Sequence, residues 1–138
     1  MASRVLIVDD EPAVCDLIKD ILSEVRLTGV CANKDIDAYR IIATPPTIKG
    51  LIVDVNLGPG TTGFDVARYA RQVIPDLPVV YVTGATTQDS FKAFGVPESV
   101  FFQKPFDAGD LLATLIDLIG LHPGAGRSPP ARMRSAGN

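Results

Sequence analysis

The chain has few of the residues that mark disulfide-linked or zinc-binding proteins. Its 138 residues include two cysteines, Cys15 and Cys31, and one histidine, His122, so neither a disulfide framework nor a structural zinc site is expected. We interpret both cysteines as small buried apolar side chains. The sequence also lacks the roughly 18 consecutive apolar residues of a membrane span and the apolar core of a secretion signal, which predicts a soluble, cytoplasmic protein.

Basic residues are scarce as well. Residues 1–120 hold all 16 acidic side chains but only 10 basic ones, which leaves this part with a net charge of −6. Because nucleic-acid phosphates bind to clustered basic faces, no nucleic-acid partner is expected for it.

The sequence after residue 120 is rich in Gly, Pro, Ser, Ala and Arg. We expect one domain over residues 1–121 and a flexible, disordered tail over residues 122–138, which has too few apolar residues to offset the entropy of ordering.

What the sequence does contain is a regular alternation of two kinds of segment. Short apolar runs rich in β-branched and aromatic residues alternate with segments of helical period, five times in all. The runs predict strands over residues 5–8, 29–32, 50–53, 79–82 and 100–102. Because these runs are nearly all apolar, the strands are expected to be buried on both faces, as in a parallel sheet.

A helix is expected after each of these strands. Apolar residues at helical spacing define four of the helices, and a shorter one is expected near residues 87–94. Asp107 is expected to cap the last helix and Gly120 to end it. The apolar residues that define the four helical faces are Val14, Leu17, Ile18, Ile21, Leu22 and Val25, then Ile36, Tyr39, Ile42 and Ala43, then Phe64, Ala67, Ala70 and Val73, and finally Leu111, Leu112, Leu115, Ile116 and Ile119.

Polar side chains follow four of the five predicted strands, at the point where each strand ends. They are Asp9 and Asp10 after the first strand, Asp54 after the third, Thr83 after the fourth and Lys104 after the fifth. The carboxyl ends of parallel strands share one edge of the sheet, and ligands bind there where the strand order reverses. The second strand supplies no such residue, as expected if it lies at the side of the sheet. We therefore expect an α/β fold, a doubly wound (βα)5 arrangement of the flavodoxin-like type, and a strand order of 2-1-3-4-5 would place the first, third, fourth and fifth strands side by side.

Three carboxylates at one edge repel one another unless a cation compensates them. Hard, anionic oxygen ligands select Mg²⁺, which binds one or two carboxylates and keeps several waters, one of which can yield to a phosphoryl oxygen. The Lys104 ammonium and the Thr83 hydroxyl can then meet other phosphoryl oxygens. Asp54 is the expected nucleophile, because a carboxylate is ionised at neutral pH and needs no general base. The simplest covalent product of such a site is an aspartyl phosphate.

Four short motifs resemble those of the response-regulator receiver domains of two-component signalling, and the resemblance covers residues 4–120. They correspond to the acidic pair, the phosphorylated strand end, the hydroxyl residue and the lysine motif of that family, and they read Asp9-Asp10-Glu11-Pro12, Val53-Asp54, Val82-Thr83-Gly84 and Lys104-Pro105-Phe106. Each motif is a weak signal by itself. Together, in this order and at these strand ends, they are specific.

The resemblance implies a set of site residues. Asp10 and Asp54 should bind Mg²⁺ directly together with the main-chain carbonyl of Asn56, while Asp9 should act mostly through a metal-bound water. It also implies a cis peptide bond between the two residues of Lys104-Pro105, although only about 5% of X-Pro bonds in folded proteins are cis.

The resemblance further places Phe101 at the position of an aromatic switch, three residues before the lysine. Phenylalanine has no hydroxyl to hold an outward pose, so we expect inward burial even before phosphorylation. The segment from Asp54 to Gly63 is about one residue longer than is usual in this family. Its middle, Gly58-Pro59-Gly60, is expected to be flexible at both ends.

The function implied by the resemblance is that of a stand-alone response regulator rather than an enzyme that acts on other substrates. Asp54 would accept a phosphoryl group from a histidine kinase or a histidine phosphotransfer protein in a Mg²⁺-dependent reaction. The signal would pass to a downstream target protein through a phosphorylation-dependent surface around the last two helices and the last strand. Phosphoryl relay, a phosphate sink and direct docking all fit the sequence.

Three other functions remain open at this point. A phosphohydrolase of the haloacid dehalogenase type also uses an aspartate nucleophile, but its general acid lies two residues later, where this chain has Asn56. A flavodoxin-like module would bind phosphate after the first strand, where Asp9, Asp10 and Glu11 would repel it. A receiver-like protein-binding module would keep the fold without phosphorylation. In the plainest interpretation, the two aspartates only cap the first helix.

Overall fold

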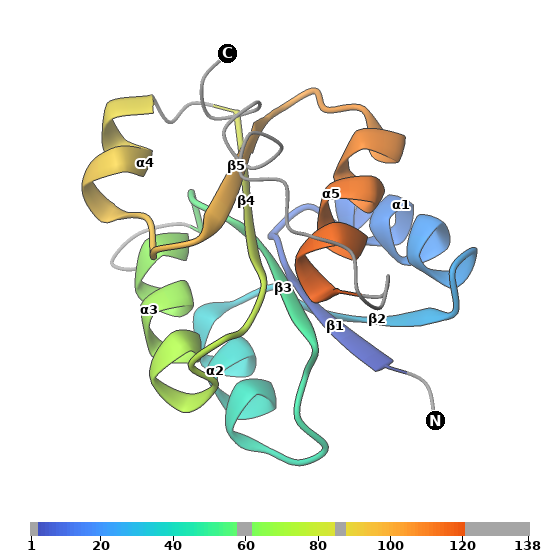
Figure 1. Cartoon of the computed structure of the whole chain (residues 1–138), viewed down its shortest axis with the longest axis horizontal. Coiled ribbons are helices and arrows are strands. Elements are labelled where there is room, and N and C mark those ends of the chain that lie inside the picture. Colours follow the sequence, from blue (N-terminus) through green and yellow to red (C-terminus); the bar gives the residue numbers. More distant parts are fainter. Residues whose placement is uncertain (1–2, 58–61, 85–87, 121–138) are drawn as a thin grey trace.

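Five parallel strands form a single sheet in the computed structural model, which describes residues 3–57, 62–84 and 88–120. The strand order is β2-β1-β3-β4-β5, and the predicted order is therefore confirmed. Each observed strand contains the predicted one. β3 lies in the middle of the sheet (Figure 1), and it ends at the predicted nucleophile, Asp54. The strands are β1 Ser3–Val8, β2 Leu27–Ala32, β3 Gly50–Asp54, β4 Val79–Thr83 and β5 Ser99–Gln103.

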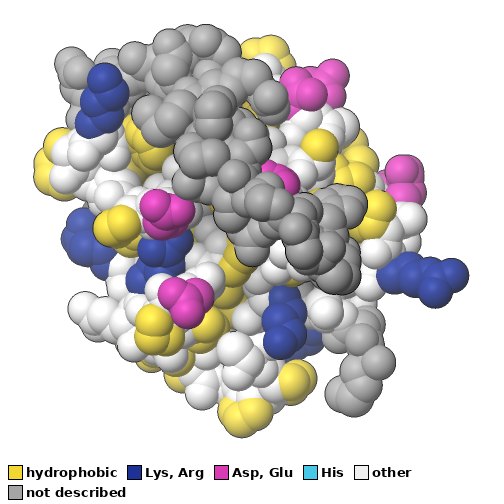
Figure 2. Space-filling model, in the orientation of Figure 1, with side chains coloured by type: hydrophobic (Ala, Val, Ile, Leu, Met, Phe, Trp, Pro, Cys, Tyr) yellow, Lys and Arg dark blue, Asp and Glu magenta, His cyan; other side chains and the backbone are white. Residues whose placement is uncertain are grey.

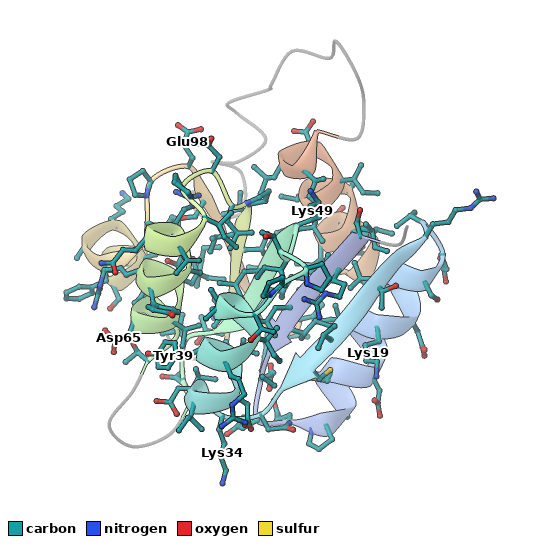
Figure 3. All side chains as sticks on the ribbon, turned by 90° about the horizontal axis from the view of Figure 1, so that it is seen from below. Lys19, Lys34, Tyr39, Lys49, Asp65 and Glu98 are labelled. Carbon is teal, nitrogen blue, oxygen red and sulfur yellow. The ribbon has the colours of Figure 1, made fainter. Side chains whose placement is uncertain are left out.

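Helices cover both faces of the sheet, as expected for a doubly wound fold. One face packs against α1 and α5, and the other against α2, α3 and α4 (Figure 1). Tyr39 and Asp65 accordingly lie on one side of the sheet, and Lys19 lies on the other (Figure 3). The helices are α1 Pro12–Ser23, α2 Asp35–Ala43, α3 Gly63–Val73, α4 Gln88–Phe94 and α5 Ala108–Ile119.

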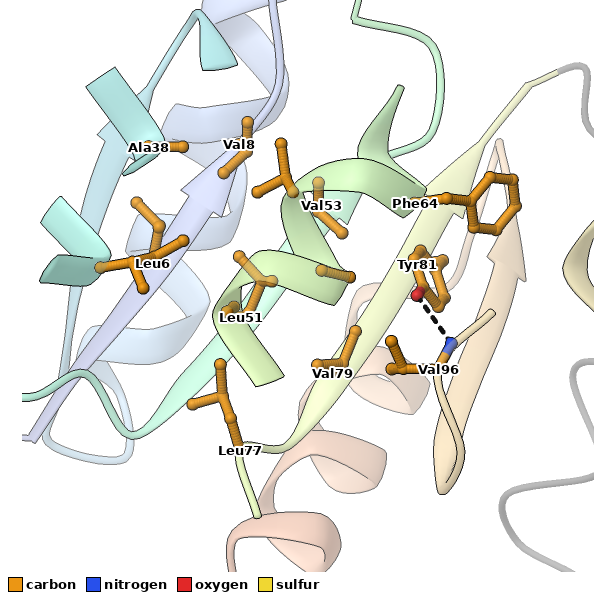
Figure 4. Packing of buried hydrophobic residues seen from close by; sticks show 14 of the residues in the cluster. Leu6, Val8, Ala38, Leu51, Val53, Phe64, Leu77, Val79, Tyr81 and Val96 are labelled. Carbon is orange, nitrogen blue, oxygen red and sulfur yellow. Dashed lines mark hydrogen bonds between the residues drawn. The ribbon is translucent and has the colours of Figure 1, made fainter. Parts of the chain in front are cut away.

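Two hydrophobic clusters hold these layers together, one on each face of the sheet. Alternate residues of β1 serve opposite faces, so that Leu6 packs in the cluster under α2 and α3 while Ile7 packs in the cluster under α1 and α5. Figure 4 shows the first cluster, in which the buried Tyr81 hydroxyl accepts a hydrogen bond from the Val96 N–H at 3.1 Å. Burial raises the pKa of Tyr81 to about 12, so its hydroxyl stays neutral at physiological pH.

The ends of α5 form as the sequence predicts. The Asp107 side chain accepts a hydrogen bond from the Asp110 N–H at 2.9 Å, which satisfies one of the free donors at the start of the helix. At the other end, Gly120 has a left-handed φ of 77°, a conformation that favours glycine. α3 begins at a capping box formed by Thr62 and Asp65.

Burial differs from the expectation at the rims of the fold. Leu17, Ile36 and Val73 are 47%, 59% and 44% exposed, although each fits the apolar spacing of its helix. β2 is only partly buried along its middle, because it lies at the side of the sheet and has a strand neighbour on one side only. Spacing predicts which face of a helix turns inward, but not how far the sheet extends beneath it.

Some expectations concern residues outside the described part of the chain. These are the disordered tail over residues 122–138, His122, and the flexible Gly58-Pro59-Gly60. None of the described helices has the length and apolar character that crossing a bilayer requires. On the face seen in Figure 2, acidic and basic side chains are scattered among apolar and uncharged surface.

Candidate functional site

Four strand ends bring their polar residues to one edge of the sheet, as the topology predicts. Asp9 follows β1, Asp54 ends β3, Thr83 ends β4 and Lys104 follows β5. The Lys104 Nζ lies 3.0 Å from an Asp9 carboxylate oxygen and 3.2 Å from an Asp54 carboxylate oxygen. These partners are 95 and 50 positions away in the sequence, so the sheet alone explains how they meet.

Three of the carboxylates form a compact cluster. One oxygen from each of Asp9, Asp10 and Asp54 lies within 4.8 Å of the others. Asp9 and Asp54 are buried, whereas Asp10 is exposed, so the cluster opens to solvent on one side. All three donors are hard anionic oxygens, and an open side leaves room for the waters that Mg²⁺ retains. The residues present therefore fit a magnesium ion.

Backbone N–H groups fix the two buried carboxylates. Oδ1 of Asp9 accepts a hydrogen bond from the Glu11 N–H at 2.8 Å, and Oδ1 of Asp54 accepts one from the Asn56 N–H at 2.9 Å. The other oxygen of each carboxylate is the one that Lys104 contacts. The interpretation of Asp9 and Asp10 as helix caps is wrong, because the N-cap of α1 is Glu11.

Burial and neighbouring charges shift the pKa values of two central groups. Burial raises the pKa of Asp54, and the nearby Asp9 carboxylate adds to this, while the Asn56 N–H and the Lys104 ammonium work against it. For Lys104, burial lowers the pKa, but hydrogen bonds to Glu11 and Asp9 outweigh burial and raise the pKa overall. Lys104 is therefore a permanent cation, and the Asp54 carboxylate carries a charge that the fold disfavours.

The raised pKa of Asp54 predicts that replacing this residue stabilises the fold. A group whose pKa is higher in the folded state contributes stability at low pH and loses that contribution as the pH rises through the folded value. In EDTA at neutral pH, the free energy of unfolding of Asp54→Asn should therefore exceed that of the wild type by about 1 kcal/mol, and the variant should unfold at a higher temperature. Thermal unfolding over a pH series measures this, and the gain should vanish as the pH falls toward the ordinary pKa of 3.8. A variant less stable than the wild type at neutral pH would contradict the electrostatic account.

Thr83 is tied to the nucleophile through Asn56. The Asn56 Nδ2 donates a hydrogen bond to the Thr83 hydroxyl oxygen at 3.1 Å, and the Asn56 N–H holds Asp54. The Lys104 N–H also donates to the Thr83 carbonyl at 2.7 Å.

The Lys104–Pro105 peptide bond is cis, and a second cis bond joins Pro45 and Pro46. The role of the Asn56 carbonyl as a metal ligand stays a prediction.

Gly63 lies against the backbone of the nucleophile. A Cβ at this position would lie 2.2 Å from the Asp54 carbonyl oxygen and 2.9 Å from the Val55 Cα. The approach is fixed by the Gly63 N–H, which donates to the Val55 carbonyl at 2.8 Å, and by a bridge between Asn56 and Thr62. No sequence motif marks Gly63, because its contact with Asp54 depends on how the loop between β3 and α3 closes.

Phe101 is buried, with 3% of its surface exposed. Its ring stacks on Phe91 of α4, with centroids 5.5 Å apart and an interplanar angle of 26°. Phe91 in turn contacts Tyr81, which is the β4 neighbour of Phe101 in the sheet register. The inward position agrees with the absence of a hydroxyl, and the part of Phe101 in switching stays a prediction.

The Glu11 side chain has a contact that the sequence did not predict. From the sequence, Glu11 was assigned only to an acidic motif and to the negative charge after the first strand, yet its Oε1 lies 3.0 Å from the Lys104 Nζ. Glu11 directly follows Asp10, so its place beside the site could be expected. Its contact with Lys104, 93 positions away, depends on how an exposed side chain extends, and strand ends do not predict this.

Comparisons with known proteins agree with this geometry. A family model described as the response regulator receiver domain matches residues 5–116. The chain is 28% identical over 119 residues to the transcriptional regulatory protein YvrH of Bacillus subtilis, covering 82% of this chain and 47% of that protein. It is 30% identical over 119 residues to the response regulator protein PilR of Pseudomonas aeruginosa, covering 83% of this chain and 26% of that protein. The chain thus spans about half or less of the length of these relatives.

A solved structure gives the same result for the fold. The response regulator receiver protein from Sinorhizobium medicae matches with a TM-score of 0.81 at 25% identity, covering 87% of this chain and 96% of that one. Receiver domains of this family are phosphoryl-accepting signalling domains that bind Mg²⁺ at an acidic pocket and interact with histidine kinases or phosphotransfer proteins. On the extent of the family match, the strand order and the acidic cluster, the chain belongs to the response-regulator receiver domains of two-component signalling.

Proposed function

We propose that this receiver domain accepts a phosphoryl group on Asp54 from a histidine kinase or a histidine phosphotransfer protein, and that phosphorylation changes a surface that binds a target protein. The observation that carries the proposal is the Lys104 ammonium, which bridges the buried carboxylates of Asp9 and Asp54 at 3.0 and 3.2 Å. A cation held beside a buried carboxylate is suited to meet the charge of a phosphoryl group on that carboxylate.

In the proposed reaction, an Asp54 carboxylate oxygen attacks the phosphorus of the donor. A new O–P bond forms, the bond from phosphorus to the donor's imidazole nitrogen breaks, and the donor leaves with that electron pair. Lys104 donates a hydrogen bond to one phosphoryl oxygen and Thr83 to another, so both act where charge is redistributed. The Asn56 N–H keeps the carboxylate oriented throughout.

The metal site in the proposal uses the acidic cluster. Asp10 and Asp54 would hold Mg²⁺ directly together with the Asn56 carbonyl, and Asp9 would contact it through a water molecule. When bound, the ion supplies positive charge to the carboxylates and to the phosphoryl oxygens. Asp9 is also bonded to Lys104, so it aligns the cation with the nucleophile.

Labelling with a small phosphodonor tests the proposal. The chain is incubated with acetyl phosphate in Mg²⁺ and analysed by intact-mass spectrometry, with Asp54→Asn as the variant and Asp76→Asn, an exposed aspartate outside the site, as the matched control. We expect the mass of one phosphoryl group on the wild type and on the control, loss of the label in EDTA, and no label on Asp54→Asn. An unlabelled wild type, or a label that persists on Asp54→Asn, would reject Asp54 as the acceptor.

Two further measurements, turnover of a phosphate ester and partner binding before and after labelling, separate the rival functions. A phosphohydrolase would release phosphate through many turnovers of a small phosphate ester, whereas the receiver should form at most one acyl phosphate per chain. Asn56, which bonds Thr83 through its amide, cannot serve as the general acid that a phosphohydrolase needs. A protein-binding module without phosphorylation would bind its partner equally well before and after labelling.

The target surface is proposed to lie around α4, β5 and α5. Phe101 of β5 stacks on Phe91 of α4, so a change at the phosphoryl site can reach α4 through this aromatic contact. α4 ends in Phe94, which is 55% exposed.

Relay, phosphate sink and docking differ in the partner that binds after phosphorylation, and phosphotransfer profiling against the histidine kinases of the source organism would separate them. The proposal places the domain in the cytoplasm, where ATP-dependent kinases act.

That the receiver acts without an output domain stays a prediction. The size of the protein made in the source cells would test it.

A further inference from the structure

Lys104 has no free hydrogen-bond donor in this structure. Its Nζ lies 3.0 Å from Asp9 Oδ2, 3.0 Å from Glu11 Oε1 and 3.2 Å from Asp54 Oδ2. An ammonium has three N–H donors, so three carboxylates occupy all of them. If Lys104 is to contact a phosphoryl oxygen on Asp54, one of these contacts must be given up.

Glu11 is the partner that can leave most easily. Asp9 is fully buried, and its second oxygen is fixed by the Glu11 N–H at 2.8 Å. Asp54 carries the phosphoryl group and is held by the Asn56 N–H. The Glu11 side chain, in contrast, is 62% exposed and can turn into water at little cost.

The Glu11 side chain has no part in capping α1. Glu11 is the N-cap residue, yet it makes no side-chain cap hydrogen bond. Its backbone N–H, which holds Asp9, does not depend on the side chain. A substitution that removes only the carboxylate therefore tests its contact with Lys104 without removing a helix cap.

We propose that Glu11 is a positioning residue that competes with the phosphoryl group for Lys104, and that its carboxylate lowers the affinity of the site for that group. The inference rests on the proposed function and goes beyond it by assigning a role to the third acidic residue of the motif. In the unphosphorylated domain Glu11 holds the third N–H of Lys104, and in the phosphorylated domain this N–H passes to a phosphoryl oxygen while Glu11 turns outward.

Binding of beryllofluoride, a stable mimic of a phosphoryl group, tests the proposal without turnover. Each variant of the full chain is titrated in Mg²⁺ and the bound fluoride is measured by ¹⁹F NMR. Glu11→Gln should bind about threefold more tightly than the wild type, because a neutral amide competes less well for an ammonium at an exposed position. Glu11→Asp keeps the charge but has a shorter reach, so it should also bind more tightly.

The control variant separates contact from general charge. Asp16→Asn removes one exposed negative charge from α1, the helix that Glu11 precedes. Asp16 has no contact to Lys104 among the described side chains, so this variant should bind like the wild type. Unchanged or weaker binding by Glu11→Gln would overturn the inference, and so would unchanged binding by Glu11→Asp or an equal gain in Asp16→Asn. A wild type that binds no beryllofluoride would instead overturn the proposed function. Equal melting temperatures would show that the variants are folded.

Discussion

Lys104→Ala should slow the phosphorylation of Asp54 by acetyl phosphate by about 10²- to 10³-fold, the loss that follows removal of one preorganised donor from a developing anion. Lys104 is the only cation that the described residues place within 4.0 Å of the site carboxylates. Without it, the buried Asp9 and Asp54 carboxylates face each other with no ammonium between them. The initial rate of labelling in saturating Mg²⁺, followed by intact-mass spectrometry, measures the effect.

Two further variants make this prediction specific. Lys34→Ala removes an exposed lysine at the start of α2 and should label at the wild-type rate. Lys104→Arg keeps the charge but replaces a compact ammonium by a planar fork, so it should recover only part of the rate. Wild-type labelling by Lys104→Ala, in a chain whose circular dichroism is unchanged, would show that the ammonium does not act on the phosphoryl group.

Gly63→Ala should lower the free energy of unfolding by about 3 kcal/mol and reduce labelling of whatever folded protein remains. The new Cβ would lie 2.2 Å from the Asp54 carbonyl oxygen and 2.8 Å from the Asp54 carbonyl carbon. Both are backbone atoms, so the conflict cannot be relieved by turning a side chain. The strand end that carries the nucleophile has to move, or the start of α3 has to separate from it.

Gly84→Ala is the matched control for this substitution. Gly84 also follows a strand end of the site, but a Cβ there would meet no described atom within 4 Å. Chemical denaturation should therefore give a large loss of stability for Gly63→Ala and a small change for Gly84→Ala. Equal stability of the two variants would mean that the close approach of Gly63 to Asp54 is not present in solution.

The fold could be predicted from the sequence because its signals are local and agree with one another. Each strand is a short apolar run. Polar residues stand at the ends of β1, β3, β4 and β5, as expected for neighbouring strands whose carboxyl ends share one edge of the sheet. β2 carries none of them, which agrees with its place at the side of the sheet. The helices were placed by spacing, but spacing could not predict that Ile36 is 59% exposed, since that depends on the width of the sheet below.

The site could be predicted only to the level of which residues meet. Asp9, Asp54 and Lys104 were expected to converge because parallel strands end at a common edge. The contact of Glu11 with Lys104 depends on two long side chains, and the approach of Gly63 to Asp54 depends on the path of a loop, so neither follows from strand ends. The inward position of Phe101 could be expected, because an apolar ring without a hydroxyl gains by burial.

The most direct test of the central claim is an experimental structure of the chain with Mg²⁺ and beryllofluoride. We predict that the mimic is bound to an Asp54 carboxylate oxygen, with one fluorine on the Lys104 ammonium and another on the Thr83 hydroxyl, and with the metal on Asp10 and Asp54. Glu11 should be turned away from Lys104, and Phe101 should remain buried. A mimic bound elsewhere, or Lys104 still bonded only to carboxylates while the mimic occupies Asp54, would contradict the account.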